Sequence, residues 1–235
     1  MRDRSSEARS GLKLCVVVVA ALLVLAGLAA WYCRQWWRSA SLPAKPRTIE
    51  DVVSALGVRV ESRLRPVFDR AGATFPPPNL TVLALKQERR LELYVTLEDG
   101  SQRFILSYPI LAASGVAGPK FREGDRQVPE GLYRIELLNP NSRYHLSLRV
   151  NYPNVADVEQ ARAEGRDLAG LGGDIMIHGG AESVGCLAIG DPAIEELFVL
   201  VAGTGLDKVR LMIAPRDFRR ETEDALAGHA PSWVA

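Results

Sequence analysis

The chain has 235 residues, enough for one ordinary domain with an appended segment but too few for two full domains. Hydrophobic residues make up 47% of it, charged residues make up 24%, and the formal net charge at pH 7 is +1. This balance is typical of a globular protein and lacks the strongly basic field that a nucleic-acid partner would require. We therefore expect one functional site and no nucleic-acid partner.

The N-terminal region contains an uncharged apolar run at residues 14–32. It follows a stretch with four cationic side chains, Arg2, Arg4, Arg9 and Lys13. A run of this length can span a bilayer, and the positive residues before it predict that the N-terminus stays inside. We therefore predict a cytoplasmic N-terminus at 1–13 and a transmembrane anchor at 14–33, with the rest of the chain outside. A signal peptide cleaved near Leu28-Ala29-Ala30 is the alternative.

A linker and a helix are expected next. Residues 34–47 include Pro43 and Pro46 among small and basic residues, a composition typical of a linker. Residues 48–79 predict an amphipathic helix and its connection, because Thr48 and Asp51 resemble a capping pair. The apolar residues that recur at helical spacing are Val52, Val53, Leu56, Val60 and Leu64. Pro66 is expected to end or kink this helix.

The remainder predicts a mainly β domain with peripheral helices. Alternation at 91–97, the Asp99-Gly100 interruption and an apolar segment at 103–108 indicate a hairpin. Further strands are expected at 131–137, 144–150, 174–177 and 208–213. Asp191-Pro192 favours the start of a helix, and Gly203 is expected to end it.

The cysteines are unevenly placed. Cys15 and Cys33 belong to the predicted anchor, which leaves Cys186 as the only cysteine of the exported domain. An unpaired thiol in an oxidising compartment is either buried and inert or kept for its reactivity.

The residues around Cys186 favour reactivity. A predicted strand delivers His178 into a glycine-rich turn that ends at Cys186. A thiol with its free pKa of about 8.5 is mostly protonated at neutral pH, and a neighbouring imidazole favours the thiolate. Glycines at 179, 180 and 185 allow a tight turn and leave backbone amides near the thiol, as an oxyanion site requires.

Two other interpretations remain open. On a helix, His178, Glu182 and Cys186 would align as three potential zinc ligands, although the intervening glycines oppose a helix. A buried structural cysteine beside a core histidine is the second. Neither interpretation explains the glycines, and we expect no metal and no other cofactor.

The motif His178-Gly, followed by Ser183-x-Gly-Cys186, resembles the signature of the L,D-transpeptidase catalytic domain (YkuD-type) family, specifically its YafK-like branch. Supporting segments occur in the same order at 118–120, 123–125, 129–133, 140–145 and 152–154. The resemblance covers residues 80–214 and implies a YkuD-like β-sandwich or barrel there. A C-terminal helix and tail are expected at 215–235.

The resemblance also implies the roles of the site residues. Cys186 would form a thioester with the L-centred diaminopimelate carbonyl of a peptidoglycan stem peptide, and an amine or water would then resolve it. His178 would act as the general base. Gly185 and Cys186 would contribute backbone amides to the oxyanion hole, and Ser183 would order the loop.

The chain departs from the main family pattern at two positions. Val184 stands where a second histidine usually precedes Gly-Cys, and Ala188 stands where an arginine usually follows. Both departures are shared by YafK-like proteins, so they question cross-linking more than catalysis. Arg143 is a candidate partner for a substrate carboxylate, although it fits a solvated surface arginine equally well. Tyr144 and Gly179 complete the predicted substrate-binding set.

These observations predict cysteine-dependent acyl transfer on stem peptides, as an L,D-transpeptidase or as an amidase that releases peptidoglycan-attached protein. The expected partners are stem peptides, with peptidoglycan-linked lipoprotein as a further candidate, and the inner membrane. The catalytic domain of this single-pass protein is expected in the periplasm. The alternative is a catalytically silent, membrane-tethered peptidoglycan-binding module, against which the intact Cys186–His178 pair argues.

Overall fold

The computed structural model describes residues 27–28 and 45–220. The chain divides into two units, residues 1–45 and residues 46–235. In the first unit the structure describes a helical Gly27–Leu28 and Lys45. The predicted segments 1–13, 14–33 and 34–47 therefore lie largely outside the described residues. Across the part of the chain that is described, no helix has both the length and the apolar character needed to cross a membrane.

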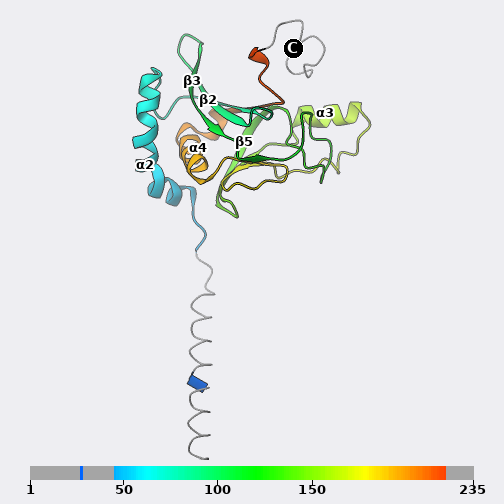
Figure 1. Ribbon diagram of the computed structural model, residues 1–235, viewed down its shortest axis with the longest axis horizontal. Helices are drawn as coiled ribbons and strands as arrows, with labels where there is room; N and C mark the ends of the chain where they lie inside the picture. Colours follow the sequence, from blue (N-terminus) through cyan, green and yellow to red (C-terminus); the bar gives the residue numbers. More distant parts are fainter. Residues whose placement is uncertain (1–26, 29–44, 221–235) are drawn as a thin grey trace, which may run out of the picture. The chain divides into compact units, whose positions relative to one another are not determined.

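The second unit is mainly β with a few helices, as the sequence predicts (Figure 1). Its strands are β1 (Leu80–Leu85), β2 (Arg90–Thr96), β3 (Gln102–Pro109), β4 (Ala112–Ala113), β5 (Gly131–Ser142), β6 (His145–Val150), β7 (Met176–His178), β8 (Leu187–Ala188) and β9 (Val209–Ala214). Its helices are α2 (Ile49–Arg70), α3 (Val155–Ala163) and α4 (Asp191–Thr204), with short 3₁₀ turns η1 (Leu206–Lys208) and η2 (Phe218–Arg220).

The strands form one nine-stranded sheet in the order β3-β2-β1-β9-β5-β6-β7-β8-β4. The pairs β1–β9 and β7–β8 are parallel, whereas the other pairs are antiparallel. The 12-residue strand β5 joins the two halves, since it pairs with β9 at its start and with β6 after that. β3 and β4 lie at opposite ends of this order. In the short link between them, the Ile110 amide donates to the Arg89 carbonyl and the Leu111 amide donates to the Ala188 carbonyl.

Helix α4 is the centre of the core on one side of the sheet. Nine of its 14 residues are buried, and Ile194, Leu197 and Phe198 have no exposed surface. α4 contacts β6 and β7 as well as α2, and Figure 1 shows it between α2 and the sheet. This packing fixes the start of α4 beside the end of β7, where the candidate site lies.

The start of α2 confirms the predicted capping pair. The Thr48 hydroxyl accepts from the Asp51 amide at 3.1 Å, and the Asp51 carboxylate accepts from the Thr48 amide at 2.8 Å. Of the two expected effects of Pro66, ending the helix is wrong, because α2 continues to Arg70, and a kink stays a prediction. Burial of Phe68, which is 0% exposed, offsets the hydrogen bond lost at the proline.

The other predicted elements are largely confirmed, with shifted ends. The hairpin forms from β2 and β3, and the four further strands correspond to β5, β6, β7 and β9. Helix α4 passes Gly203 and ends at Thr204, with Gly205 at its C-cap in a left-handed conformation (φ 94°). Of the predicted C-terminal helix and tail, only the part up to Arg220 is described, and it contains the turn η2.

Candidate active site

The short parallel pair β7–β8 brings the two predicted catalytic residues into one region. Ile177 pairs with Leu187, and His178 pairs with Ala188. Cys186 immediately precedes β8, so it lies beside Met176, two residues before His178 on the neighbouring strand. The loop 179–186 therefore returns to the strand from which it departs.

The Cys186 thiol is partly buried and bonded to the backbone at the start of β7 and just before it. Its Sγ accepts from the Met176 amide at 3.4 Å and donates to the Asp174 carbonyl at 3.7 Å. Burial raises the pKa of the Cys186 thiol, and the Met176 amide and the Lys120 charge oppose this shift only in part. The resting thiol is therefore mostly protonated at neutral pH.

The His178 imidazole is 2% exposed and oriented by its own loop. Its Nδ1 lies 2.6 Å from the Gly179 carbonyl oxygen, and the Tyr144 ring stacks on it with centroids 4.5 Å apart. A carbonyl can only accept, so Nδ1 carries the proton and Nε2 is left as the basic nitrogen. Burial lowers the pKa of His178 more than the Gly179 carbonyl raises it. The imidazole is neutral at pH 7 and can accept a proton.

The two backbone amides predicted for the oxyanion hole both have acceptors. The Cys186 amide donates to the Ser183 hydroxyl at 3.0 Å, and that hydroxyl donates to the Cys186 carbonyl at 2.6 Å. These two bonds fit the loop-ordering role expected of Ser183, which stays a prediction. The Gly185 amide donates to the Ser114 hydroxyl at 2.5 Å. Ser114 is distant in sequence and belongs to no motif, so sequence reasoning did not find it.

Gly179 is required by a close approach of α4 and the β5–β6 turn. A Cβ at this position would lie 2.5 Å from the Asp191 Oδ1 and 2.6 Å from the Tyr144 carbonyl oxygen. The same Asp191 oxygen accepts from the Gly180 amide at 2.8 Å. Asp191 is thus a positioning residue that sequence reasoning assigned only to a helix start. A substrate contact of Gly179 stays a prediction.

The β5–β6 turn brings Tyr144 to the site, whereas Arg143 and His145 on either side of it have different surroundings. Tyr144 is 43% exposed and covers the His178 ring, so it lies in the site. Arg143 is exposed on the same turn and makes no ion pair with another described residue. His145 instead lies with its Nε2 2.8 Å from Glu195 of α4, a structural contact.

The geometry does not support the zinc interpretation. Residues 179–186 form a loop, so His178, Glu182 and Cys186 do not share a helix face. Within residues 45–220 and 27–28, no group of three or more His, Cys, Asp and Glu side chains is arranged to hold a metal.

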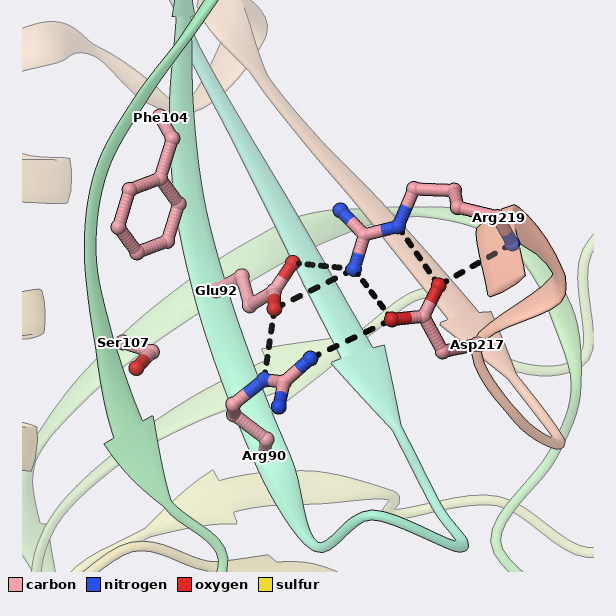
Figure 2. Close-up of a pocket in the computed structure, with 6 residues that line it drawn as sticks. All are labelled: Arg90, Glu92, Phe104, Ser107, Asp217 and Arg219. Carbon is pink, nitrogen blue, oxygen red and sulfur yellow. Dashed lines mark hydrogen bonds and ion pairs between the residues drawn. The ribbon is translucent and has the colours of Figure 1, made fainter.

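Two cavities of about 530 and 750 Å³ lie elsewhere on the domain, and neither is lined by Cys186 or His178. Figure 2 shows the smaller one, where charged side chains of β2 and the C-terminal segment pair with one another. Arg90 is 2.6 Å from Glu92, and Arg219 is 2.7 Å from Asp217. These ion pairs leave the cavity without an excess of either charge.

Comparison with known proteins gives consistent matches. The model of the YkuD family, the L,D-transpeptidase catalytic domain, matches residues 81–211. YafK of Escherichia coli (strain K12), provisionally named an L,D-transpeptidase, is 40% identical over 136 residues, which are 55% of this chain and 51% of YafK. The chain thus matches about half the length of this relative.

Two solved structures are also similar. One is the helical cell shape determining protein Pgp2 from Campylobacter jejuni, with 26% identity, a TM-score of 0.48, and coverage of 63% of this chain and 52% of Pgp2. The other is Bd1075 of Bdellovibrio bacteriovorus, with 19% identity, a TM-score of 0.41, and coverage of 59% and 48%.

The protonation states predict the pH dependence of thiol reactivity. Because burial raises the pKa of the Cys186 thiol, iodoacetamide should alkylate it slowly at pH 7, and the rate should still rise above pH 9. Mass spectrometry of the Cys186 peptide over a pH series measures this, with the unfolded protein as the reference thiol. A rate that reaches its plateau below pH 7 would instead reveal a preformed thiolate–imidazolium pair.

Proposed function

The chain belongs to the L,D-transpeptidase catalytic domain family, and on this basis we propose that it is a cysteine-dependent acyltransferase of peptidoglycan stem peptides. Its function is related to peptidoglycan through the family. The observation that carries the proposal is the orientation of His178, whose Nδ1 is bonded to the Gly179 carbonyl. This bond leaves Nε2 as a neutral base at the end of β7, next to the loop that carries Cys186.

In the proposed reaction, the Cys186 thiol transfers its proton to Nε2 of His178 as sulfur attacks the L-centred diaminopimelate carbonyl. The tetrahedral intermediate collapses to a thioester, and the departing amine takes the proton from the imidazolium. An amine or water then attacks the thioester and restores the thiol. In the resting site the thiol is bonded to Asp174 rather than to the imidazole, so substrate binding must bring the pair together.

The acceptor determines whether the product is a cross-link or a hydrolysed peptide. Attack by an amine gives transpeptidation, whereas attack by water gives hydrolysis or release of peptidoglycan-linked lipoprotein. Transpeptidation and hydrolysis would proceed through the same thioester. The exposed Val184, at 73%, occupies the position of the second histidine of the main family pattern. We propose hydrolysis as a rival to cross-linking, because the histidine usual at this position is absent.

Substitution of the base provides the main test. His178→Gln should reduce turnover by roughly 10²–10⁴-fold, because it removes proton transfer. Turnover is measured by mass spectrometry of muropeptides and lipoprotein-linked fragments, which also separates cross-linked from hydrolysed products.

His145→Gln is the matched control, since this histidine contacts Glu195, and its activity should stay within a few-fold of the wild type. Cys186→Ala defines the background. If the wild-type chain gives no more product than Cys186→Ala, the acyltransferase is wrong and the silent peptidoglycan-binding module replaces it.

Arg143 is proposed to bind a substrate carboxylate, since it is exposed on the turn whose Tyr144 covers the imidazole. Arg143→Gln should raise KM for stem peptides about tenfold while kcat changes little, because an arginine–carboxylate pair contributes to binding. Arg103→Gln, on the distant strand β3, serves as the control. An unchanged KM in Arg143→Gln would leave this arginine as a solvated surface residue.

We also propose that residues 14–33 anchor the chain in the inner membrane with the domain in the periplasm. The support is the uncharged apolar run preceded by cationic residues. After carbonate extraction the chain should remain in the membrane fraction. Leu22→Arg with Leu25→Arg should release it, since each charge at the centre of a span costs about 2.5–3.5 kcal/mol. Soluble periplasmic protein that begins near Trp31 would contradict the anchor.

A further inference from the structure

The hydroxyl of Ser114 occupies the hydrogen-bonding position of a backbone amide next to the candidate nucleophile. Its oxygen accepts from the Gly185 amide at 2.5 Å, and its proton is donated to the Arg126 carbonyl at 2.7 Å. The contact joins positions 71 residues apart in the chain. It therefore links the cysteine loop to the separate segment 114–127.

In the proposed acyl transfer, the Gly185 amide is needed by the carbonyl oxygen of the substrate rather than by the Ser114 hydroxyl. When sulfur adds to a carbonyl, negative charge develops on its oxygen, and backbone amides near the sulfur stabilise that charge. A charged oxygen is a stronger acceptor than a neutral hydroxyl, so it can displace the serine from the amide. While the serine is bound, however, the amide is occupied.

Ser183 and Ser114 differ in how easily they can leave. Ser183 belongs to the cysteine loop and bonds both the amide and the carbonyl of Cys186, so its removal would open the loop. Ser114 follows the two-residue strand β4 and bonds Gly185 through its side chain alone. Rotation of one side-chain torsion to another staggered position removes its oxygen without moving the backbone.

The base of the segment is fixed while its tip is exposed. Lys86 donates to the Gly118 and Val128 carbonyls at 3.0 and 2.9 Å and pairs with Glu130 at 2.8 Å. Between these tethers and β4, Val116 is 70% exposed. Ser114 itself is partly exposed, and neither tether involves it.

We propose that Ser114 is a placeholder residue: its hydroxyl caps the Gly185 amide in the ligand-free enzyme, and the oxygen of the acyl substrate replaces it during attack by Cys186. This inference rests on the proposed acyltransferase function. It implies that the hydroxyl competes with the reaction, so that its removal increases the rate of acylation.

The test compares two reactions of the same thiol. p-Nitrophenyl acetate acylates Cys186: sulfur bonds to the acetyl carbon, p-nitrophenolate leaves with the bonding electrons, and the thiol proton passes to His178. Iodoacetamide alkylates the same sulfur by displacing iodide, a step with no oxyanion. The measured quantity is the acylation rate divided by the alkylation rate. Thiol ionisation and access affect both rates, so this ratio reports on the oxyanion site. Peptide mapping confirms that Cys186 is the residue modified.

Ser114→Ala should raise this ratio about two- to tenfold, the range expected when one competing hydrogen bond is removed. Ser114→Gly should act in the same direction, and Ser114→Thr, which keeps the hydroxyl, should give a smaller gain. Ser62→Ala, which removes an exposed hydroxyl on α2, should leave the ratio unchanged.

An unchanged or lower ratio in folded Ser114→Ala and Ser114→Gly would show that the serine organises the site instead, and the placeholder would be rejected. If p-nitrophenyl acetate acylates the wild type no faster than it acylates Cys186→Ala, the proposed acyltransferase function is rejected. The placeholder role of Ser114 is then rejected with it. Acylation of the wild type without a gain in the serine variants rejects the placeholder alone.

Discussion

The parallel pairing of β7 with β8 is the constraint on which the site depends. Only Ile177–Leu187 and His178–Ala188 form this pair, yet all four side chains are buried. Apolar burial at this point stabilises a pairing that is too short to be stable on its own. Because β7 also pairs with β6 and contacts α4, the position of the cysteine loop is set by the core rather than by the loop itself.

Burial sets the electrostatics of the site as well as its geometry. It raises the pKa of Cys186 and lowers the pKa of His178, so both groups are neutral in the resting state. Two backbone carbonyls favour this neutral state. The Gly179 carbonyl accepts from the imidazole, and the Asp174 carbonyl accepts from the thiol. In the proposed reaction, the thiolate and imidazolium would form only with substrate bound, because the substrate's oxyanion and orientation would offset the cost of separating their charges.

The sequence predicted what depends on local pattern. Alternation and turn residues identified the hairpin and four strands, and Thr48-Asp51 identified a helix start, because each signal lies within a few residues. α3 was missed because Ala161 is its only buried residue, which leaves no apolar face to detect, although Asn154 and Asp157 form a capping box. Ser114 and Asp191 could not be assigned to the site, because their bonds to Gly185 and Gly180 arise only from tertiary structure.

The surroundings of Ala188 suit the alanine that stands where the main family pattern usually has an arginine. Ala188 pairs with His178 on one side and Ala112 on the other, and it has no exposed surface. A guanidinium there would need space that the packing of β8 does not provide, and burying its charge without a partner would be costly. Under the proposed function, another element would have to bind the substrate carboxylate. Arg143 on the β5–β6 turn stays the proposed residue, because its neighbour Tyr144 stacks on the His178 ring.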